Sequence, residues 1–180
     1  MTKIRVLVVE DSMTVRQRII GVLAADPDIE IVGEAGDGKR AIELCLELRP
    51  DVITLDMMLP VMTGLAATEY IMAYCPTPIL IVSASTNRGE LFRTYEALAA
   101  GAVDVLDKPH GTEEDGLWEA RLLSTVKLVA RIKVITHPRA RLANMTPSAA
   151  IGSASPATLP HTRGSRTVVA IGASTGGPAA

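Results

Sequence analysis

Short aliphatic runs alternate with longer amphipathic stretches along the first 135 residues. The runs cover Ile4 to Val9, Ile29 to Glu34, Val52 to Leu55, Ile79 to Val82 and Ala102 to Leu106. The fourth run is continuously apolar, and the first is apolar apart from Arg5, which is typical of strands covered on both faces. Each run is followed by a stretch long enough to form a crossover helix. The pattern therefore predicts five parallel strands connected by helices.

Two of the intervening stretches show a clear helical period. One apolar face comprises Val15, Ile19, Val22 and Leu23, and another comprises Ala41, Leu44, Cys45 and Leu48. Asp26-Pro27 and Arg49-Pro50 end these two helices, because the residue before a proline disfavours the helical conformation. Right-handed crossovers place helices on both sides of the sheet. The expected fold is an α/β, doubly wound, five-stranded parallel sheet with the flavodoxin-like order 2-1-3-4-5.

The pattern changes after the last predicted helix, which we expect to run from Glu113 to Ile135. His137-Pro138 interrupts it, and Pro, Ser, Ala, Thr and Gly dominate up to Ser165. An apolar run begins again at Thr167 and continues to Gly172. We therefore expect one domain over residues 1–135, a flexible linker over 136–166 and the start of a second domain over 167–180.

The chain is split in charge. Residues 1–119 contain 20 acidic and 10 basic side chains, whereas residues 120–180 contain 8 basic side chains and no acidic ones. These basic side chains are scattered and have no aromatic residues between them, so we expect no nucleic-acid partner. The sequence also has no apolar run of membrane-spanning length and no signal peptide, which predicts a cytoplasmic protein without membrane insertion. Cys45 and Cys75 lack CxxC spacing and are expected to be buried free thiols.

Polar residues follow four of the five predicted strands. Glu10 and Asp11 follow the first, Asp56 the third and Ser83 the fourth, and Lys108 lies just beyond the fifth. The carboxyl ends of parallel strands share one edge of the sheet, so these residues are expected to converge. Three converging carboxylates repel one another unless a hard cation neutralises them. The cluster therefore predicts a Mg²⁺ site open to water, with Mn²⁺ as an alternative.

A carboxylate such as Asp56 can also act as a nucleophile toward phosphorus and form an aspartyl phosphate. Lys108 and the Ser83 hydroxyl are then placed to stabilise phosphoryl oxygens. Each residue also has an ordinary structural interpretation: Asp11 or Ser12 as a helix N-cap, Ser83 as another cap, and Lys108 as a solvated charge. Capping alone does not account for so many polar strand ends at one edge, which favours a phosphoacceptor site.

These residues carry a resemblance to response-regulator receiver domains that covers residues 1 to about 135. The matching motifs are Val9-Glu10-Asp11-Ser12, Leu55-Asp56-Met57-Met58-Leu59-Pro60 with Gly64, Ser83-Ala84, and Lys108-Pro109. The resemblance implies that Asp56 is phosphorylated and that Asp11 and Asp56 are metal ligands. It also implies that Glu10 holds a metal-bound water, that Met58 contributes its backbone carbonyl, and that the Lys108–Pro109 bond is cis.

A narrower resemblance is to chemotaxis-type protein-glutamate methylesterases. It rests on Arg49 to Val52, Pro76 to Ile79, Ser83 to Gly89, Gly101 to Asp104 and the run Gly172 to Pro178, within which Ser174 would be the esterase nucleophile. This resemblance implies phosphorylation by a chemotaxis-type histidine kinase and control of the protein's own esterase domain. That domain would act on chemoreceptors by hydrolysing glutamyl methyl esters and deamidating glutamines. The base and carboxylate that such a serine needs lie downstream in that family, so we expect no esterase activity from these 180 residues.

Three positions depart from the common receiver pattern. Val105 stands where many receivers carry a switching aromatic residue, Thr63 stands where an Asp is common, and Asp107 adds a negative charge beside Lys108. None of these changes removes the expected chemistry. The alternative function is a non-catalytic receiver that acts through phosphorylation-dependent protein binding.

Overall fold

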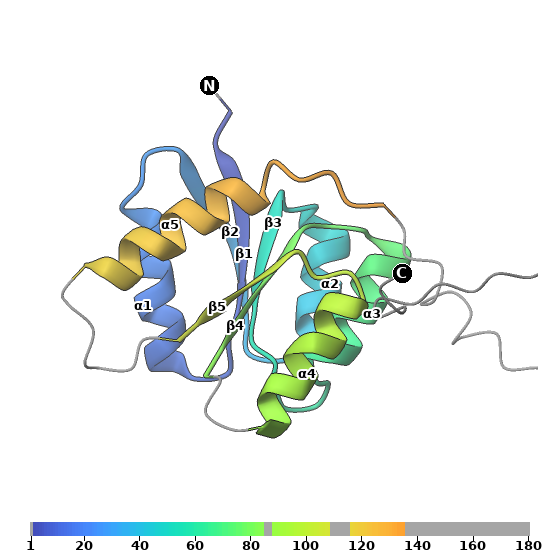
Figure 1. Ribbon diagram of the computed structural model, residues 1–180. Coiled ribbons are helices and arrows are strands. Elements are labelled where there is room, and N and C mark those ends of the chain that lie inside the picture. Colours follow the sequence, from blue (N-terminus) through green and yellow to red (C-terminus); the bar gives the residue numbers. More distant parts are fainter. Residues whose placement is uncertain (1, 85–87, 109–115, 136–180) are drawn as a thin grey trace, which may run out of the picture. The chain divides into compact units, whose positions relative to one another are not determined.

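The computed structural model describes residues 2–84, 88–108 and 116–135, and Figure 1 shows how their elements are arranged. The strands are β1 (Ile4–Val9), β2 (Ile29–Ala35), β3 (Val52–Leu55), β4 (Ile79–Ser83) and β5 (Asp104–Asp107). The helices are α1 (Met13–Ala24), α2 (Gly38–Leu48), α3 (Gly64–Tyr74), α4 (Arg88–Ala99) and α5 (Leu117–Val129). All strand pairs are parallel, and the order is β2-β1-β3-β4-β5, which confirms the predicted fold class.

The sheet separates two hydrophobic cores. On one face the strands pack against α2, α3 and α4 through a cluster that includes Leu7, Ile53, Ile81, Cys45, Ile71 and Ala97. On the other face they pack against α1 and α5 through a cluster that includes Val6, Leu80, Ile19, Leu23, Leu122 and Val126. Figure 1 shows α1 and α5 together on one side of the strands and the other three helices on the opposite side. Because both faces are covered, the inner strands β1, β3 and β4 consist mainly of buried aliphatic residues.

Side-chain caps begin three of the helices. Ser12 accepts a hydrogen bond from the backbone of Val15, Asp37 from Arg40, and Thr63 from Ala66. Such caps satisfy amide groups that have no partner within the helix. Ser12, and not Asp11, is therefore the cap of α1, which leaves the Asp11 carboxylate available for other contacts.

Two predicted boundaries differ from the structure by two residues or more. β5 begins at Asp104 and not at Ala102, because the N–H of Ala102 bonds to the carbonyl of Ala97 at the end of α4. Among the described residues, α5 ends at Val129 and not at Ile135; Glu113 itself lies outside the described residues. The chain leaves the helix because Val134 packs on the opposite core from α5. β-Branched residues at 132, 134 and 135 also favour an extended chain.

The expected linker (136–166) and the expected start of a second domain (167–180) lie outside the described residues. Within the described part, no helix is both long enough and apolar enough to cross a membrane.

Candidate functional site

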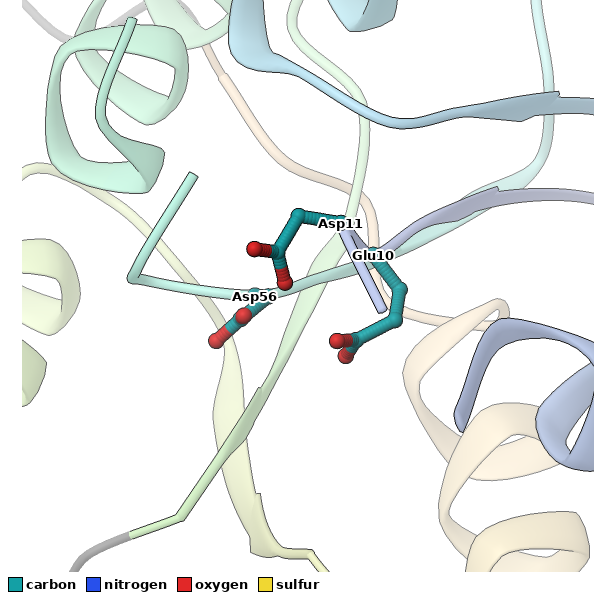
Figure 2. Close-up of side chains that lie close together, drawn as sticks. All are labelled: Glu10, Asp11 and Asp56. Carbon is teal, nitrogen blue, oxygen red and sulfur yellow. The ribbon is translucent and has the colours of Figure 1, made fainter. Parts of the chain in front are cut away.

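Three carboxylates converge at the carboxyl edge of the sheet, as predicted. Glu10 and Asp11 directly follow β1, and Asp56 directly follows β3, the neighbouring strand. One carboxylate oxygen from each lies within 4.8 Å of the others, and Figure 2 shows the three side chains gathered above the strand ends. Glu10 and Asp56 are buried whereas Asp11 is exposed, so the cluster has one open side.

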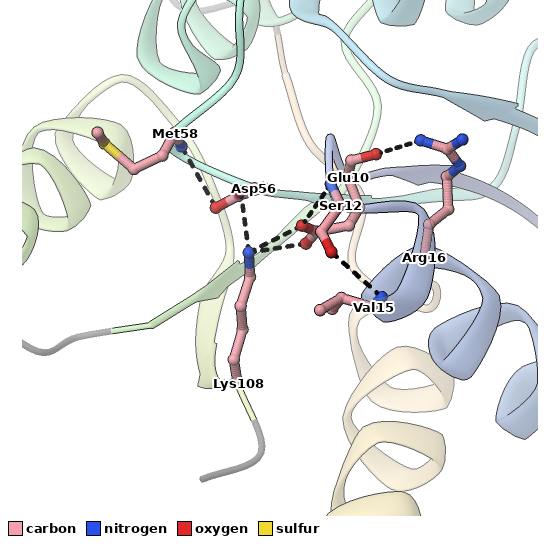
Figure 3. A network of polar contacts seen from close by, with 7 residues as sticks. All are labelled: Glu10, Ser12, Val15, Arg16, Asp56, Met58 and Lys108. Atoms are coloured by element: carbon pink, nitrogen blue, oxygen red, sulfur yellow. Dashed lines mark hydrogen bonds and ion pairs between the residues drawn. The ribbon is translucent and has the colours of Figure 1, made fainter.

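The Lys108 ammonium group lies between the two buried carboxylates. Its Nζ is 2.8 Å from Oε2 of Glu10, 3.0 Å from Oε1 of Glu10 and 2.9 Å from Oδ2 of Asp56 (Figure 3). Lys108 follows β5, which is two strands away from β3, and its stem spans that distance. A single cation therefore partly neutralises a site that contains three carboxylates.

This arrangement shifts the pKa values of Glu10 and Lys108. Burial raises the pKa of Glu10 above its ordinary 4.5; the hydrogen bond from Lys108 opposes this rise, and the nearby Asp56 charge adds to it. Burial by itself would lower the pKa of Lys108 from 10.5, but its hydrogen bonds to Glu10 and Asp56 outweigh that effect and raise it. Lys108 is thus held as a cation, while Glu10 carries a charge at an unfavourable position.

Two hydrogen bonds to Glu10 stabilise the turn between β1 and α1. The backbone N–H of Ser12 donates to Oε1 of Glu10 at 3.2 Å. The Arg16 guanidinium donates to the carbonyl of Glu10 at 2.6 Å and forms an ion pair with Glu34 at 3.0 Å. Arg16 therefore fixes the backbone that carries Glu10 and Asp11, as Figure 3 shows.

Asp56 is held equally closely. Its backbone N–H donates to the carbonyl of Val9, and its Oδ1 accepts a hydrogen bond from the N–H of Met58 at 3.3 Å. The first residue of α3, Gly64, lies so close that a Cβ at that position would overlap the carbonyl oxygen of Asp56. Only glycine allows α3 to begin against the backbone of this carboxylate.

Ser83 ends β4 beside Asp107 of β5 in the strand register. Its carbonyl accepts the N–H of Lys108 at 2.9 Å. Its hydroxyl is buried, with 1% of the residue exposed, and has no hydrogen-bond partner among the described residues. Buried hydroxyls are normally paired, so this one is available to an incoming group.

The structure thus brings together Glu10, Asp11, Asp56 and Lys108 and places Ser83 at the neighbouring strand end. The carboxylate of Asp107 is exposed, and it is the carbonyl of this residue that makes a described contact, with Trp118. Ser174 and Pro109, and with Pro109 the predicted cis bond, lie outside the described residues.

Two residues that hold the site, Arg16 and Trp118, were not predicted from the sequence. Arg16 follows an ordinary helix start and resembles a solvated charge in the sequence, although its side chain reaches back to Glu10. Trp118 reads as a core aromatic residue, and it is buried, but its indole N–H also bonds to β5. An arginine four residues after an N-cap, and the presence of a single tryptophan, were the available signals.

Comparison with known proteins agrees with this geometry. The profile of the response regulator receiver domain matches residues 6–117. The chain belongs to the response-regulator receiver family. The receiver is also similar to the crystal structure of the response regulator domain of Thermotoga maritima CheB. That similarity has a TM-score of 0.65 and 38% identity, and it covers 73% of this chain and 98% of the other.

Two curated relatives of the receiver are named protein-glutamate methylesterase/protein-glutamine glutaminase. One from Anaeromyxobacter dehalogenans is 46% identical over 179 residues, which is 98% of this chain and 49% of the relative. One from Carboxydothermus hydrogenoformans is 45% identical over 143 residues, which is 78% of this chain and 40% of the relative. The resemblance to this group of proteins is therefore confirmed. The chain spans about half the length, or less, of these two relatives.

Proposed function

We propose that the receiver accepts a phosphoryl group on Asp56 from a phosphohistidine of a chemotaxis-type histidine kinase. The observation that carries the proposal is the buried Asp56 carboxylate, which lies beside Lys108 and two further carboxylates. The Ser83 hydroxyl, which has no partner among the described residues, ends the neighbouring strand β4. An Asp56 carboxylate oxygen would attack phosphorus and form the new O–P bond. The P–N bond to the histidine would break, and its electron pair would remain on the imidazole nitrogen.

The chain's own side chains have distinct tasks in this transfer. The N–H of Met58 orients one oxygen of Asp56, and the ammonium group of Lys108 holds the other. As negative charge moves to the phosphoryl oxygens, Lys108 would follow it as a mobile point charge. The Ser83 hydroxyl would donate to another phosphoryl oxygen and would then no longer be an unpaired buried group.

The acidic cluster fits a divalent cation. Its donors are oxygen atoms, one side is open to water, and three carboxylates face a single ammonium group. Asp11, Asp56 and the backbone carbonyl of Met58 would hold Mg²⁺, with Glu10 acting through a water molecule and Mn²⁺ able to substitute. The cation would offset the charge that develops on the transferred group.

For the whole protein we propose control of a methylesterase domain. Residues 136–166 would be a linker and residues 167–180 the start of that domain, with Ser174 as its nucleophile. The support is the similarity to relatives named protein-glutamate methylesterase/protein-glutamine glutaminase. The activity would be hydrolysis of glutamyl methyl esters, together with glutamine deamidation, on chemoreceptors in the cytoplasm.

The test is intact-mass spectrometry of the chain after incubation with acetyl phosphate, with Mg²⁺ or with a chelator. We expect a gain of one phosphoryl group that needs the metal and is lost in Asp56→Asn. Asp107→Asn is the matched control, because it also removes a carboxylate next to Lys108 but from an exposed position. An adduct that persists in Asp56→Asn, or that forms equally well under chelation, would refute the proposed site.

A further inference from the structure

The peptide group that joins Asp107 to Lys108 is bonded on both sides. Its carbonyl oxygen accepts a hydrogen bond from the indole Nε1 of Trp118 at 2.7 Å. Its N–H donates to the carbonyl of Ser83 at 2.9 Å. The backbone that carries Lys108 is therefore fixed before the side chain extends toward the carboxylates.

Trp118 is itself held firmly. It lies in the first turn of α5, is 2% exposed, and packs in the core shared by α1, α5 and the sheet. The Arg18 guanidinium of α1 lies 5.3 Å from its ring centre, a distance typical of cation–π contacts. Arg18 also forms a 2.7 Å ion pair with Glu119, the next residue along α5. The Trp118 side chain thus connects α5, to which it belongs, with α1 and with the end of β5.

We propose that Trp118 is a positioning residue for Lys108, because its indole N–H holds the Asp107–Lys108 peptide at the end of β5. The inference rests on the proposed function. The indole N–H determines where the Asp107–Lys108 peptide lies, and that peptide determines how the ammonium group reaches Asp56. A movement of Lys108 toward a phosphoryl group would pull on the same peptide and change the surroundings of the indole.

The position of Trp118 matters because β5 has no aromatic residue of its own. Val105, where many receivers have a switching ring, is a small aliphatic side chain packed on the opposite core. Trp118 is the single tryptophan in the chain, and it contacts the backbone next to Lys108 directly. Tryptophan emission from this chain therefore reports on the surroundings of this one indole.

The decisive variant is Trp118→Phe, which keeps a buried ring but removes the N–H donor. We expect phosphoryl uptake from acetyl phosphate with Mg²⁺ to slow about threefold to tenfold, the range that one neutral hydrogen bond represents. Arg18→Met is the matched control, because it removes the ring contact and the ion pair with Glu119 but leaves the indole donor in place. We expect Arg18→Met to take up phosphoryl at the unmodified rate, and the tryptophan emission of the unmodified chain to change on phosphorylation.

Uptake is measured by intact mass at a temperature where urea unfolding shows all three proteins to be folded. A purely structural role would lower the stability of Trp118→Phe and leave its uptake rate unchanged, which would overturn the positioning role. Equal slowing in Arg18→Met, or an emission spectrum that does not respond to phosphorylation, would also overturn it. If the unmodified chain takes up no phosphoryl group, the proposed function itself is wrong. Normal uptake by every variant would refute only the role of Trp118.

Discussion

The substitution Thr54→Val should make the receiver more stable. Thr54 lies in the middle of β3, with Val8 of β1 and Leu80 of β4 as its partners in the strand register. The residue is 1% exposed, and its hydroxyl has no hydrogen-bond partner among the described residues. Folding therefore removes this hydroxyl from water without giving it a replacement bond. Valine keeps the branched shape that favours a strand and replaces the hydroxyl with a methyl group.

The size of the gain follows from the desolvation of the hydroxyl. An unsatisfied buried polar group costs about 1–3 kcal/mol. Removing it stabilises the fold by less than this amount, because the added methyl group must fit into a closely packed core. We expect the free energy of unfolding to rise by about 1–2 kcal/mol, which for a domain of this size raises Tm by about 5 °C. Urea unfolding should show a higher midpoint with an unchanged slope, because the surface exposed on unfolding stays the same.

A matched control is available in α3. Thr68 is also fully buried, but its hydroxyl donates to the carbonyl of Gly64 at 2.8 Å. Thr68→Val is the same chemical change with the hydrogen bond present, so it should lower stability by about 0.5–1.5 kcal/mol. The reasoning is refuted if Thr54→Val unfolds at the same or a lower urea concentration than the unmodified chain. It is refuted equally if both substitutions shift stability in the same direction.

Three further predictions concern the site and the thiols. Gly64→Ala should lower stability by about 2–3 kcal/mol and slow phosphoryl uptake, because its Cβ would overlap the carbonyl of Asp56; unchanged urea unfolding would contradict this. Because burial raises the pKa of Glu10 above 4.5, the metal-free fold should gain stability as pH falls through that pKa toward 4.5 and lose it as pH rises. Mg²⁺ should also bind more weakly as Glu10 becomes protonated; a stability profile no different from that of Glu10→Gln would argue against both effects. Burial raises the pKa of Cys45 to about 12, so iodoacetamide at pH 8 should label it only after unfolding in urea, and rapid labelling of the folded chain would contradict its burial.

The sequence predicted the fold well because its strongest signals are local. Aliphatic runs located β1 and β4, and the flavodoxin-like arrangement expected of a five-stranded doubly wound sheet supplied the strand order. The predicted start of β5 was wrong because Ala102 bonds back to the end of α4. The predicted end of α5 was wrong because Val134 packs on the far face of the sheet. The first error came from a local hydrogen bond at a helix end and the second from a tertiary contact, and a hydrophobic pattern contains neither.

The sequence predicted which residues converge at the site but not the contacts that their side chains make. Strand ends in a parallel sheet determine where the backbone places Asp56, Glu10 and Lys108, so their convergence could be predicted. The direction of each side chain could not, because it depends on rotamers and neighbouring charges. Lys108 was expected to stabilise a phosphoryl oxygen, but its contacts with both buried carboxylates were not predicted. Arg16 was missed for the same reason, since only the folded turn brings its guanidinium group to the carbonyl of Glu10.

The position of Lys108 suggests how one cation serves two states of the site. Buried carboxylates without a counter-charge are strongly unfavourable, so Lys108 stabilises Glu10 and Asp56 in the resting fold. In the proposed reaction Asp56 becomes an acyl phosphate, which is a mixed anhydride, so that its carboxylate charge is lost and the charge of the phosphoryl oxygens takes its place. Glu10 and Asp11, which would hold a divalent cation, would then not depend on the ammonium group as their counter-charge, and Lys108 would be free to follow that charge. The same electrostatic attraction would therefore hold the unmodified site together and favour its modified form, with Lys108 moving only a short distance between the two.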